Sequence, residues 1–262
     1  MLVRCFGASY LPLMAQDLTT IPTTPPEGAS KEKARKQAKA YASVIGDLTT
    51  QFAAVGSHAM LIVFQGMDAS GKDGAVRKAF SRSSPANLHV TSFKKPTELE
   101  MRHDFLWRVH QHAPAKGDIA IWNRSHYEDV LIQRVHGWID DDTVDARFEA
   151  INAFERNLQR DNDTIILKFL LHTSKDEQEE QLRERLEEPD KHYKHNPGDW
   201  AEREHWDAYI EAYNDVLRRS EIPWIVTPTD KRWWRDYLVS KTIMDALQDL
   251  DMEWPGLPPE AD

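Results

Sequence analysis

The sequence predicts an α/β fold: a five-stranded parallel sheet with helices on both faces, three layers in all, and a helical lid. Three observations predict it. Apolar segments of strand length alternate with helical segments along most of the 262 residues, which is typical of a parallel sheet covered by helices. A glycine-rich turn separates the first apolar segment from the next helical segment, as in folds that bind phosphate. A charged segment with prolines and a glycine interrupts the alternation after the fourth strand.

Charge and composition limit the classes of protein. The 33 Lys and Arg residues against 43 Asp and Glu residues leave a net charge of −10, and 40% of the residues are hydrophobic. These values are typical of a single globular domain and argue against nucleic acid as the main partner. The sole cysteine, Cys5, cannot form an internal disulfide, so we expect a reducing, cytoplasmic compartment. No segment approaches the ~20 apolar residues of a membrane span, so we expect no membrane partner.

The N-terminal part is expected to be a flexible arm followed by a long helix. The arm covers residues 1–30, because residues 17–30 have the prolines and threonines of a linker. Residues 31–55 are expected to form an amphipathic helix, since their apolar side chains recur with helical spacing. Gly56 is placed to end this helix.

The remaining elements follow from the alternation. Five apolar segments are expected to form the strands, at residues 58–65, 88–94, 118–123, 164–171 and 222–228. Further helices are expected at 75–82, 98–111, within 126–136, and at 143–160 and 231–250. Ser174 and Glu177 form a capping box that begins the charged insert. We therefore expect a domain over 31–250 with a lid at about 175–205, followed by a flexible tail at 251–262.

A phosphate-binding loop is predicted between the first strand and the next helix. Gly66 to Lys72, GMDASGK, match the pattern G-x-x-x-x-G-K. In such loops the backbone N–H groups and the helix N-terminus attract a phosphate, and the lysine adds a mobile positive charge. The alternative is a chance glycine-rich turn, against which the strand and helix context argues. The residues predicted to bind phosphate here are Gly66, Ala69, Ser70, Gly71, Lys72 and Asp73.

A magnesium site is predicted inside this loop. Asp73 stands where such loops normally have the Ser or Thr that binds Mg²⁺, so another oxygen must hold the metal. Asp68 is the candidate, because a carboxylate beside phosphate oxygens is favourable only with a cation between them. The alternative is that Asp68 only caps a turn. We expect Mg²⁺ at Asp68, with Mn²⁺ as an alternative ion.

A second polar cluster follows the third predicted strand. Asn123 ends that strand and Arg124 comes next. Arg124 is expected at the carboxyl edge of the sheet, where open α/β sheets bind ligands and where a guanidinium matches phosphate. Glu128 and Asp129 either belong to the same cluster or are solvated acids in the first turn of a helix. The predicted catalytic residues are Asp68, Lys72, Asn123, Arg124, Glu128 and Asp129.

These motifs resemble the polyphosphate kinase 2 family. The resemblance covers residues 30–250 and rests on the segments GMDASGKDG, TSFK, HDFLWR, NRSHYEDV and RLEEPDKHYKHNPGDW. It implies a P-loop kinase-like fold with a lid, in which Asp68 helps to bind magnesium. It also implies that Lys72 and Arg124 bind phosphates. Asn123, followed by the acidic pair, is similar to the class III branch, whose members use both AMP and ADP.

The resemblance extends to the lid. It implies that Arg185, Lys191 and Lys194 bind phosphate. Two positions depart from the family pattern, since Tyr193 stands where the family often has Trp and Gln181 where it often has a basic residue.

A nucleotide pocket is expected near the carboxyl ends of the strands. The residues predicted to bind the nucleotide are Gly74, Arg77, Phe93, Lys94, Phe105, Arg108, Tyr127 and Asp129. For several of these residues, a surface role is the alternative. His110 and His112 form a pair without a third ligand nearby, which favours packing over a zinc site.

The expected function is phosphoryl transfer from inorganic polyphosphate to AMP and ADP, giving ADP and ATP, reversible in principle. Phosphate acceptors are already ionised, so no general base is needed. The alternatives are a nucleoside monophosphate kinase that uses ATP and a non-catalytic protein that binds nucleotide or polyphosphate. The expected partners are polyphosphate, AMP, ADP and ATP, and a homo-oligomer, either dimer or tetramer, is expected.

Overall fold

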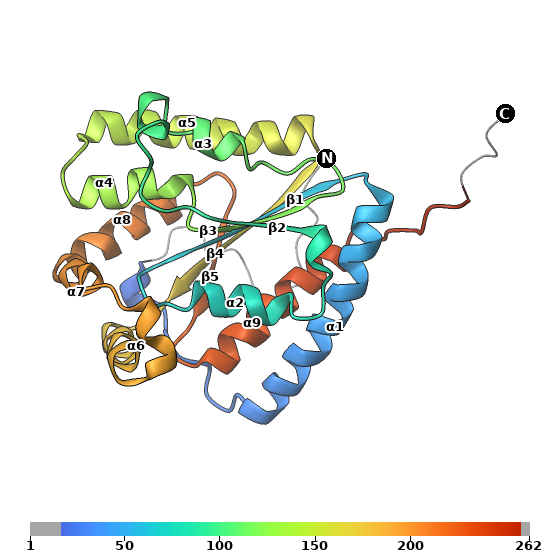
Figure 1. Cartoon of the computed structure of the whole chain (residues 1–262), viewed down its shortest axis with the longest axis horizontal. Helices are drawn as coiled ribbons and strands as arrows, with labels where there is room; N and C mark the ends of the chain where they lie inside the picture. Colours follow the sequence, from blue (N-terminus) through green and yellow to red (C-terminus); the bar gives the residue numbers. More distant parts are fainter. Residues whose placement is uncertain (1–16, 258–262) are drawn as a thin grey trace.

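The computed structural model describes residues 17–257, in which the expected parallel sheet is confirmed (Figure 1). The strands are β1 (Ala59–Gly66), β2 (Leu88–Ser92), β3 (Ile119–Asn123), β4 (Thr164–His172) and β5 (Trp224–Pro228). They lie in the order β2-β3-β1-β4-β5, and every neighbouring pair is parallel. All carboxyl ends therefore lie at one edge of the sheet.

Helices fill the connections between the strands. The α-helices are α1 (Lys31–Val55), α2 (Lys72–Ala79), α3 (Trp107–His110), α4 (Ile132–Val135), α5 (Asp141–Asp161), α6 (Lys175–Glu187), α7 (Gly198–Glu202), α8 (Trp206–Arg219) and α9 (Arg232–Gln248). The 3-10 helices are η1 (Leu18–Thr20), η2 (Pro85–Asn87), η3 (Glu100–Arg102), η4 (His126–Val130), η5 (Pro189–Lys194) and η6 (Arg203–His205). Gly56 adopts a left-handed conformation directly after α1 (φ 60°), so the helix ends where the sequence predicts.

The molecule has three layers, with β1 buried in the middle. Every residue of β1 is buried, because helices cover both faces of the sheet. Met60, Ile62 and Phe64 face a core shared with α1, α2 and α9. Leu61 and Val63 face the opposite core, which includes side chains of α5 and α8. This alternation is what a strand buried on both faces requires.

The segment between β2 and β3 differs from the prediction. The single helix expected over 98–111 is wrong, since the chain forms only the short helices η3 and α3. His103, between them, is extended (φ −113°, ψ 173°). The Asp104 carboxylate accepts a hydrogen bond from the backbone N–H of Leu106 at 3.0 Å. This local bond begins a new turn, although the apolar spacing continues across the break.

Residues 17–23 pack against the domain, which differs from the flexible arm expected over residues 1–30. Leu18 is buried in the core, and its N–H donates to Asn214 Oδ1 at 2.8 Å. The hydroxyl of Thr23 donates to Asp230 Oδ2 at 2.6 Å. The prolines and threonines predicted a linker, and composition could not reveal these contacts because they join residues far apart in the sequence. The rest of the expected arm, residues 1–16, lies outside the described residues.

The C-terminal segment leaves the domain after α9. Residues 251–257 form no regular secondary structure, but the carbonyl of Met252 accepts a hydrogen bond from Gln51 Nε2 at 2.7 Å. The rest of the tail, residues 258–262, lies outside the described part of the chain. Within residues 17–257, no helix combines the length and the apolar character that crossing a membrane requires.

Candidate functional site

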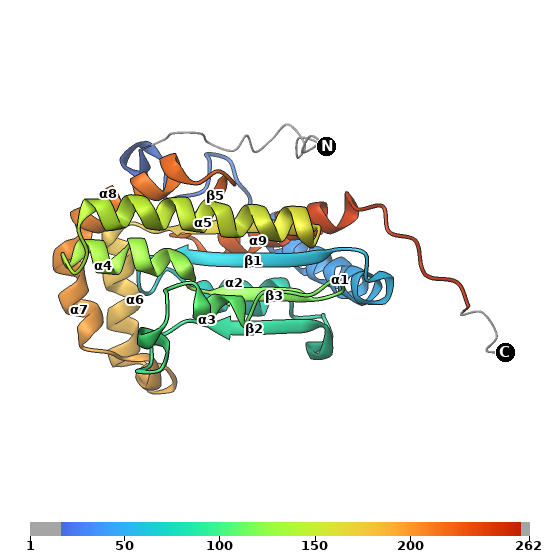
Figure 2. The same cartoon turned by 90° about the horizontal axis from the view of Figure 1, so that it is seen from above.

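A large basic cavity lies at the carboxyl edge of the sheet, where the segment carrying α6 and α7 extends beyond the strands (Figure 2). Its volume is about 720 Å³. It is lined by ten Lys and Arg side chains but only four Asp and Glu side chains. The basic residues are Lys72, Arg77, Lys94, Lys95, Arg124, Arg185, Lys191, Lys194, Arg232 and Arg235, and the acidic ones are Asp68, Asp73, Glu184 and Asp199. A protein of net charge −10 thus concentrates positive potential at one site, which favours a polyanionic ligand.

The predicted phosphate-binding loop joins β1 to α2 at this cavity. Gly66 has φ 149°, and a Cβ there would lie 2.6 Å from the carbonyl oxygen of Leu171. Gly71 has φ 93°, and a Cβ there would lie 2.1 Å from a guanidinium nitrogen of Arg235. Both positions therefore require glycine. Asp68, Ala69, Gly71, Lys72 and Asp73 line the cavity, whereas Gly66 and Ser70 do not.

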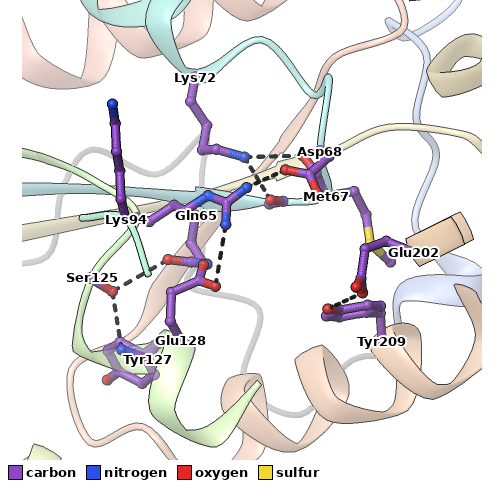
Figure 3. Close-up of polar contacts among 12 residues, drawn as sticks. Gln65, Met67, Asp68, Lys72, Lys94, Ser125, Tyr127, Glu128, Glu202 and Tyr209 are labelled. Atoms are coloured by element: carbon purple, nitrogen blue, oxygen red, sulfur yellow. Dashed lines mark hydrogen bonds and ion pairs between the residues drawn. The ribbon is translucent and has the colours of Figure 1, made fainter. Parts of the chain in front are cut away.

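Lys72 turns its ammonium back onto the loop (Figure 3). Its Nζ donates hydrogen bonds to the backbone carbonyls of Gly66 at 2.8 Å and Met67 at 3.0 Å. The side chain is 9% exposed. Burial, and secondly the positive charge of Arg124, lower the pKa of Lys72 to about 8. The ammonium therefore lies inside the loop, with a charge that a bound anion would stabilise.

The lowered pKa predicts a pH dependence of anion binding. We expect the affinity for inorganic tripolyphosphate to fall as the pH rises through about 8, because Lys72 is charged below its pKa and neutral above it. The loss should approach about tenfold per pH unit above the pKa. Calorimetric titration over this pH range measures it, with Lys72→Met as the control that reports the titration of the ligand alone. An identical pH dependence in both proteins would contradict the prediction.

The second motif meets the loop through two side-chain contacts. The Arg124 guanidinium pairs with Asp68 and lies 3.7 Å from Glu128 Oε2. The amide of Asn123 donates a hydrogen bond to Asp73 Oδ1. Negative charge, chiefly that of Glu128, raises the pKa of Arg124 above its ordinary value. The structure thus brings the two predicted motifs together, as the parallel arrangement of β1 and β3 requires.

Arg124, the first residue of the second motif after β3, has a strained backbone. Arg124 adopts a left-handed conformation, with φ 62°, which is uncommon for a residue with a side chain. Its N–H donates to the carbonyl of Phe64 at 2.9 Å. This bond ties the residue after β3 to the end of β1, beside the loop.

A divalent cation at the loop would need oxygen ligands from a bound phosphate in addition to those of the protein. Within residues 17–257, no group of three or more His, Cys, Asp or Glu side chains could hold a metal ion. Asp68 lines the cavity, and its side chain is 23% exposed. Mg²⁺ is commonly held by one or two carboxylates together with substrate phosphates and water. A site at Asp68 completed by phosphate oxygens fits this donor set, whereas a site made by the protein alone does not.

The comparison with protein families decides the identity. The model of the family described as polyphosphate kinase 2 matches residues 28–255, which includes the loop, the second motif and the segment over the cavity. The chain belongs to the polyphosphate kinase 2 family. It is therefore a kinase with an α/β fold.

Individual relatives agree with this assignment. The chain is 46% identical over 205 residues to an AMP/ADP-polyphosphate phosphotransferase of Meiothermus ruber, covering 77% of this chain and 76% of that protein. It is 37% identical over 245 residues to an ADP-polyphosphate phosphotransferase of Rhodopseudomonas palustris, covering 88% and 84%. The crystal structure of polyphosphate kinase 2 from Arthrobacter aurescens TC1 superposes with a TM-score of 0.89 at 35% identity, covering 98% of this chain and 91% of that one.

The expected lid residues of this polyphosphate kinase line the cavity, but most are already paired. Arg185 and Asp199 form an ion pair at 2.6 Å. Lys191 pairs with Glu184 at 2.7 Å. Lys194 also lines the cavity, with its ammonium 5.5 Å from the ring centroid of Tyr193. Acidic neighbours therefore compensate part of the charge that the sequence analysis assigned to phosphate binding.

The predicted nucleotide residues of the kinase divide into two groups. Gly74, Arg77, Phe93 and Lys94 line the cavity. Four others do not line it: Phe105, Arg108, Tyr127 and Asp129. Arg108 is buried and donates to the carbonyl of Lys94 at 3.0 Å, so it supports a residue that lines the cavity.

The other residues that do not reach the cavity have their own partners. The hydroxyl of Tyr127, which is fully buried, donates to Glu155 Oε1 at 3.1 Å and accepts from Lys168 Nζ at 2.7 Å. Asp129 is buried, and burial raises its pKa to about 6. The ring of Phe105 lies 5.1 Å from the Arg147 guanidinium.

The sequence analysis missed several residues of the kinase site. Arg232 and Arg235 line the cavity from the first turn of α9. Arg235 is buried and donates to the carbonyl of Gly71 at 3.1 Å. The RWWR spacing after the fifth strand could have indicated them, since residues three apart share a helix face. Lys95 and Asp199 also line the cavity, and the sequence carried no such signal for them.

Proposed function

We propose that this kinase transfers phosphoryl groups from inorganic polyphosphate to AMP and ADP, giving ADP and ATP, in a reaction that is reversible in principle. The observation that carries the proposal is the pairing of Asp68 with Arg124, which joins the phosphate-binding loop to the second motif in one basic cavity. The names of the relatives from Meiothermus ruber and Rhodopseudomonas palustris, with AMP/ADP and ADP as acceptors, support it. Neither alternative function has comparable support.

The cavity has the properties that such a transfer needs. Its volume of about 720 Å³ lies within the range of small-molecule sites. An acceptor phosphate attacks through an oxygen that is already ionised, so the site needs no general base. Catalysis then depends on alignment of the two phosphates and on neutralisation of the charge that develops between them. Lys72 and Arg124, which both line the cavity, supply that positive charge.

We include Mg²⁺ in the proposal, held by the Asp68 carboxylate together with phosphate oxygens. Bound there, the ion would neutralise charge on the transferring phosphate. Mn²⁺ is the alternative, since it takes the same oxygen ligands. The segment from α6 to α7 would exclude water by closing over the cavity.

One assay tests the proposed function. The protein is incubated with AMP, Mg²⁺ and long-chain polyphosphate in the absence of ATP, and nucleotides are separated by chromatography. We expect ADP to form first and ATP to follow. A kinase that requires ATP as donor would leave AMP unchanged, and so would a protein that only binds its ligands. Either result would overturn the proposal.

We expect Asn123 to influence the choice between AMP and ADP. Its amide donates to the carboxylate of Asp73, so Asn123→Asp would place two carboxylates in contact and turn one of them toward the acceptor phosphates. The ratio of kcat/KM for AMP to that for ADP should change by about two- to tenfold. Steady-state kinetics with each acceptor measures this ratio. An unchanged ratio would show that Asn123 is not a selector.

We also propose a cellular location, a class of partner and an assembly state. The sole cysteine supports a cytoplasmic location, and the net charge of −10 supports small polyanions rather than nucleic acid as partners. Assembly as a homo-oligomer, dimer or tetramer, is a prediction of the sequence analysis that sedimentation velocity would measure.

A further inference from the structure

Gln65 is a buried polar side chain at the end of the central strand β1. It directly precedes Gly66, the first residue of the phosphate-binding loop, and it has 0% exposure. The residues of β1 before it are apolar. Burying an amide costs free energy unless hydrogen bonds replace its contacts with water. The amide of Gln65 therefore needs hydrogen-bond partners within the protein.

Both ends of the amide have partners in the second motif (Figure 3). The Gln65 Nε2 group donates to Glu128 Oε1. The Gln65 Oε1 atom accepts from the hydroxyl of Ser125 at 3.3 Å. Ser125 also begins η4, because its Oγ accepts from the N–H of Tyr127 at 3.2 Å. The side chain thus connects β1 to the residue that caps η4 and to Glu128 in the middle of that helix.

The connection continues to the loop. Glu128 uses one carboxylate oxygen for Gln65 and places the other 3.7 Å from Arg124. Arg124 in turn pairs with Asp68. The polar chain therefore runs from Gln65 through Glu128 and Arg124 to Asp68. Arg124 also has the left-handed backbone described above, and such a conformation persists only where surrounding contacts fix it.

We propose that Gln65 is a positioning residue of this kinase: its buried amide holds Glu128 against Arg124 and so keeps the guanidinium directed at the phosphate-binding loop. An amide suits this position because it donates to one neighbour and accepts from the other. A carboxylate of the same shape would face Glu128 as a like charge, and an apolar side chain would leave Glu128 without its donor. This role rests on the proposed transfer reaction.

The test compares single variants with an exchange of the two side chains. Gln65→Met and Gln65→Glu are each expected to lower kcat for polyphosphate-driven AMP phosphorylation by about 10- to 100-fold, with a smaller change in the KM for AMP. In the double variant Gln65→Glu/Glu128→Gln, donor and acceptor are exchanged but the hydrogen bond is kept. It should be more active than Gln65→Glu and Glu128→Gln, a non-additivity that independent sites would not show.

A control and a binding measurement separate this role from stability and from the transfer reaction. Thr164→Val alters another buried polar side chain, at the start of β4, and should leave kcat unchanged. The rise in Tm caused by inorganic tripolyphosphate is measured for every variant, since ligand binding stabilises the folded state. We expect it to shrink in the single variants and to recover in the double variant. This readout decides for or against Gln65 even if the wild-type protein transfers no phosphate to nucleotides, which would overturn only the proposed function.

The role of Gln65 would be overturned by either of two results. One is a wild-type kcat and a wild-type response to tripolyphosphate in Gln65→Met and Gln65→Glu. The other is a double variant that is no better than the single variants in either measurement. If a single variant does not fold, recovery of folding and of the tripolyphosphate response in the double variant still supports the pairing.

Discussion

Replacing Lys72 with alanine is expected to lower kcat for transfer in both directions by about 10²- to 10³-fold, the usual cost of removing a charge-stabilising group from an active site. The ammonium lies within the loop, bound to the carbonyls of Gly66 and Met67, where a phosphate would be its stronger partner. No other Lys or Arg of the described chain hydrogen-bonds to these two carbonyls. The measurement is single-turnover transfer with saturating polyphosphate and AMP.

Stability and charge can be separated at this position. Lys72→Met keeps most of the length of the side chain, so it fills much of the same space in the loop without the charge. We expect both variants to retain the fold, with Tm within a few degrees of the wild type, because the lost hydrogen bonds join a side chain to a loop rather than two core elements. A methionine variant that keeps its activity, or a loss of activity matched by unfolding, would contradict an electrostatic role.

The sheet and the loop were predictable because their signals are local. Apolar runs of strand length that alternate with helical segments predict a parallel sheet. The glycines at 66 and 71 have positive φ angles that disfavour other residues. The proximity of Asp68 and Arg124 was also predictable, since the carboxyl ends of parallel strands meet at one edge. No structure was needed for these inferences.

Tyr127 shows where local reasoning fails. It stands in the middle of the second motif, so the sequence placed it in the nucleotide pocket. The turn of η4 instead directs its ring into the core, where its hydroxyl contacts Glu155 from α5 and Lys168 from β4. Glu128, the next residue, faces Gln65 and Arg124. Adjacent residues of a helical turn point in different directions, and only the position of that turn on the sheet shows which of them faces Arg124.

Arg235 is the opposite case, a residue that lines the cavity although the sequence analysis did not predict it. It is separated from Gly71 by 164 positions in the sequence, yet it donates to the carbonyl of that loop residue. The sequence analysis expected a helix over residues 231–250 but assigned no ligand-binding residue to it. Where a helix crosses a loop is set by packing across the whole sheet, which periodicity alone does not specify.

Replacing Asp68 with asparagine should separate metal binding from anion binding. The structure places the carboxylate in the cavity against Arg124, where a bound cation would meet phosphate oxygens. The amide keeps the shape but removes the charge that Mg²⁺ prefers. We expect kcat to fall by about 10²-fold or more, and the Mg²⁺ concentration for half-maximal rate to rise by about tenfold. Steady-state rates over a Mg²⁺ titration measure both quantities.

Asp73→Ser is the matched control, because it restores the hydroxyl that phosphate-binding loops usually carry at this position. Asp73 accepts from Asn123, so the change should cost far less activity than Asp68→Asn and leave the Mg²⁺ dependence near that of the wild type. Without metal, Asp68→Asn should bind tripolyphosphate more tightly than the wild type, since the variant lacks the carboxylate that repels phosphate. Tighter metal-free binding combined with slower transfer is what loss of a metal-ligating acid produces. If Asp73→Ser were the damaging change and Asp68→Asn kept a normal Mg²⁺ dependence, the metal ligand would have to be Asp73.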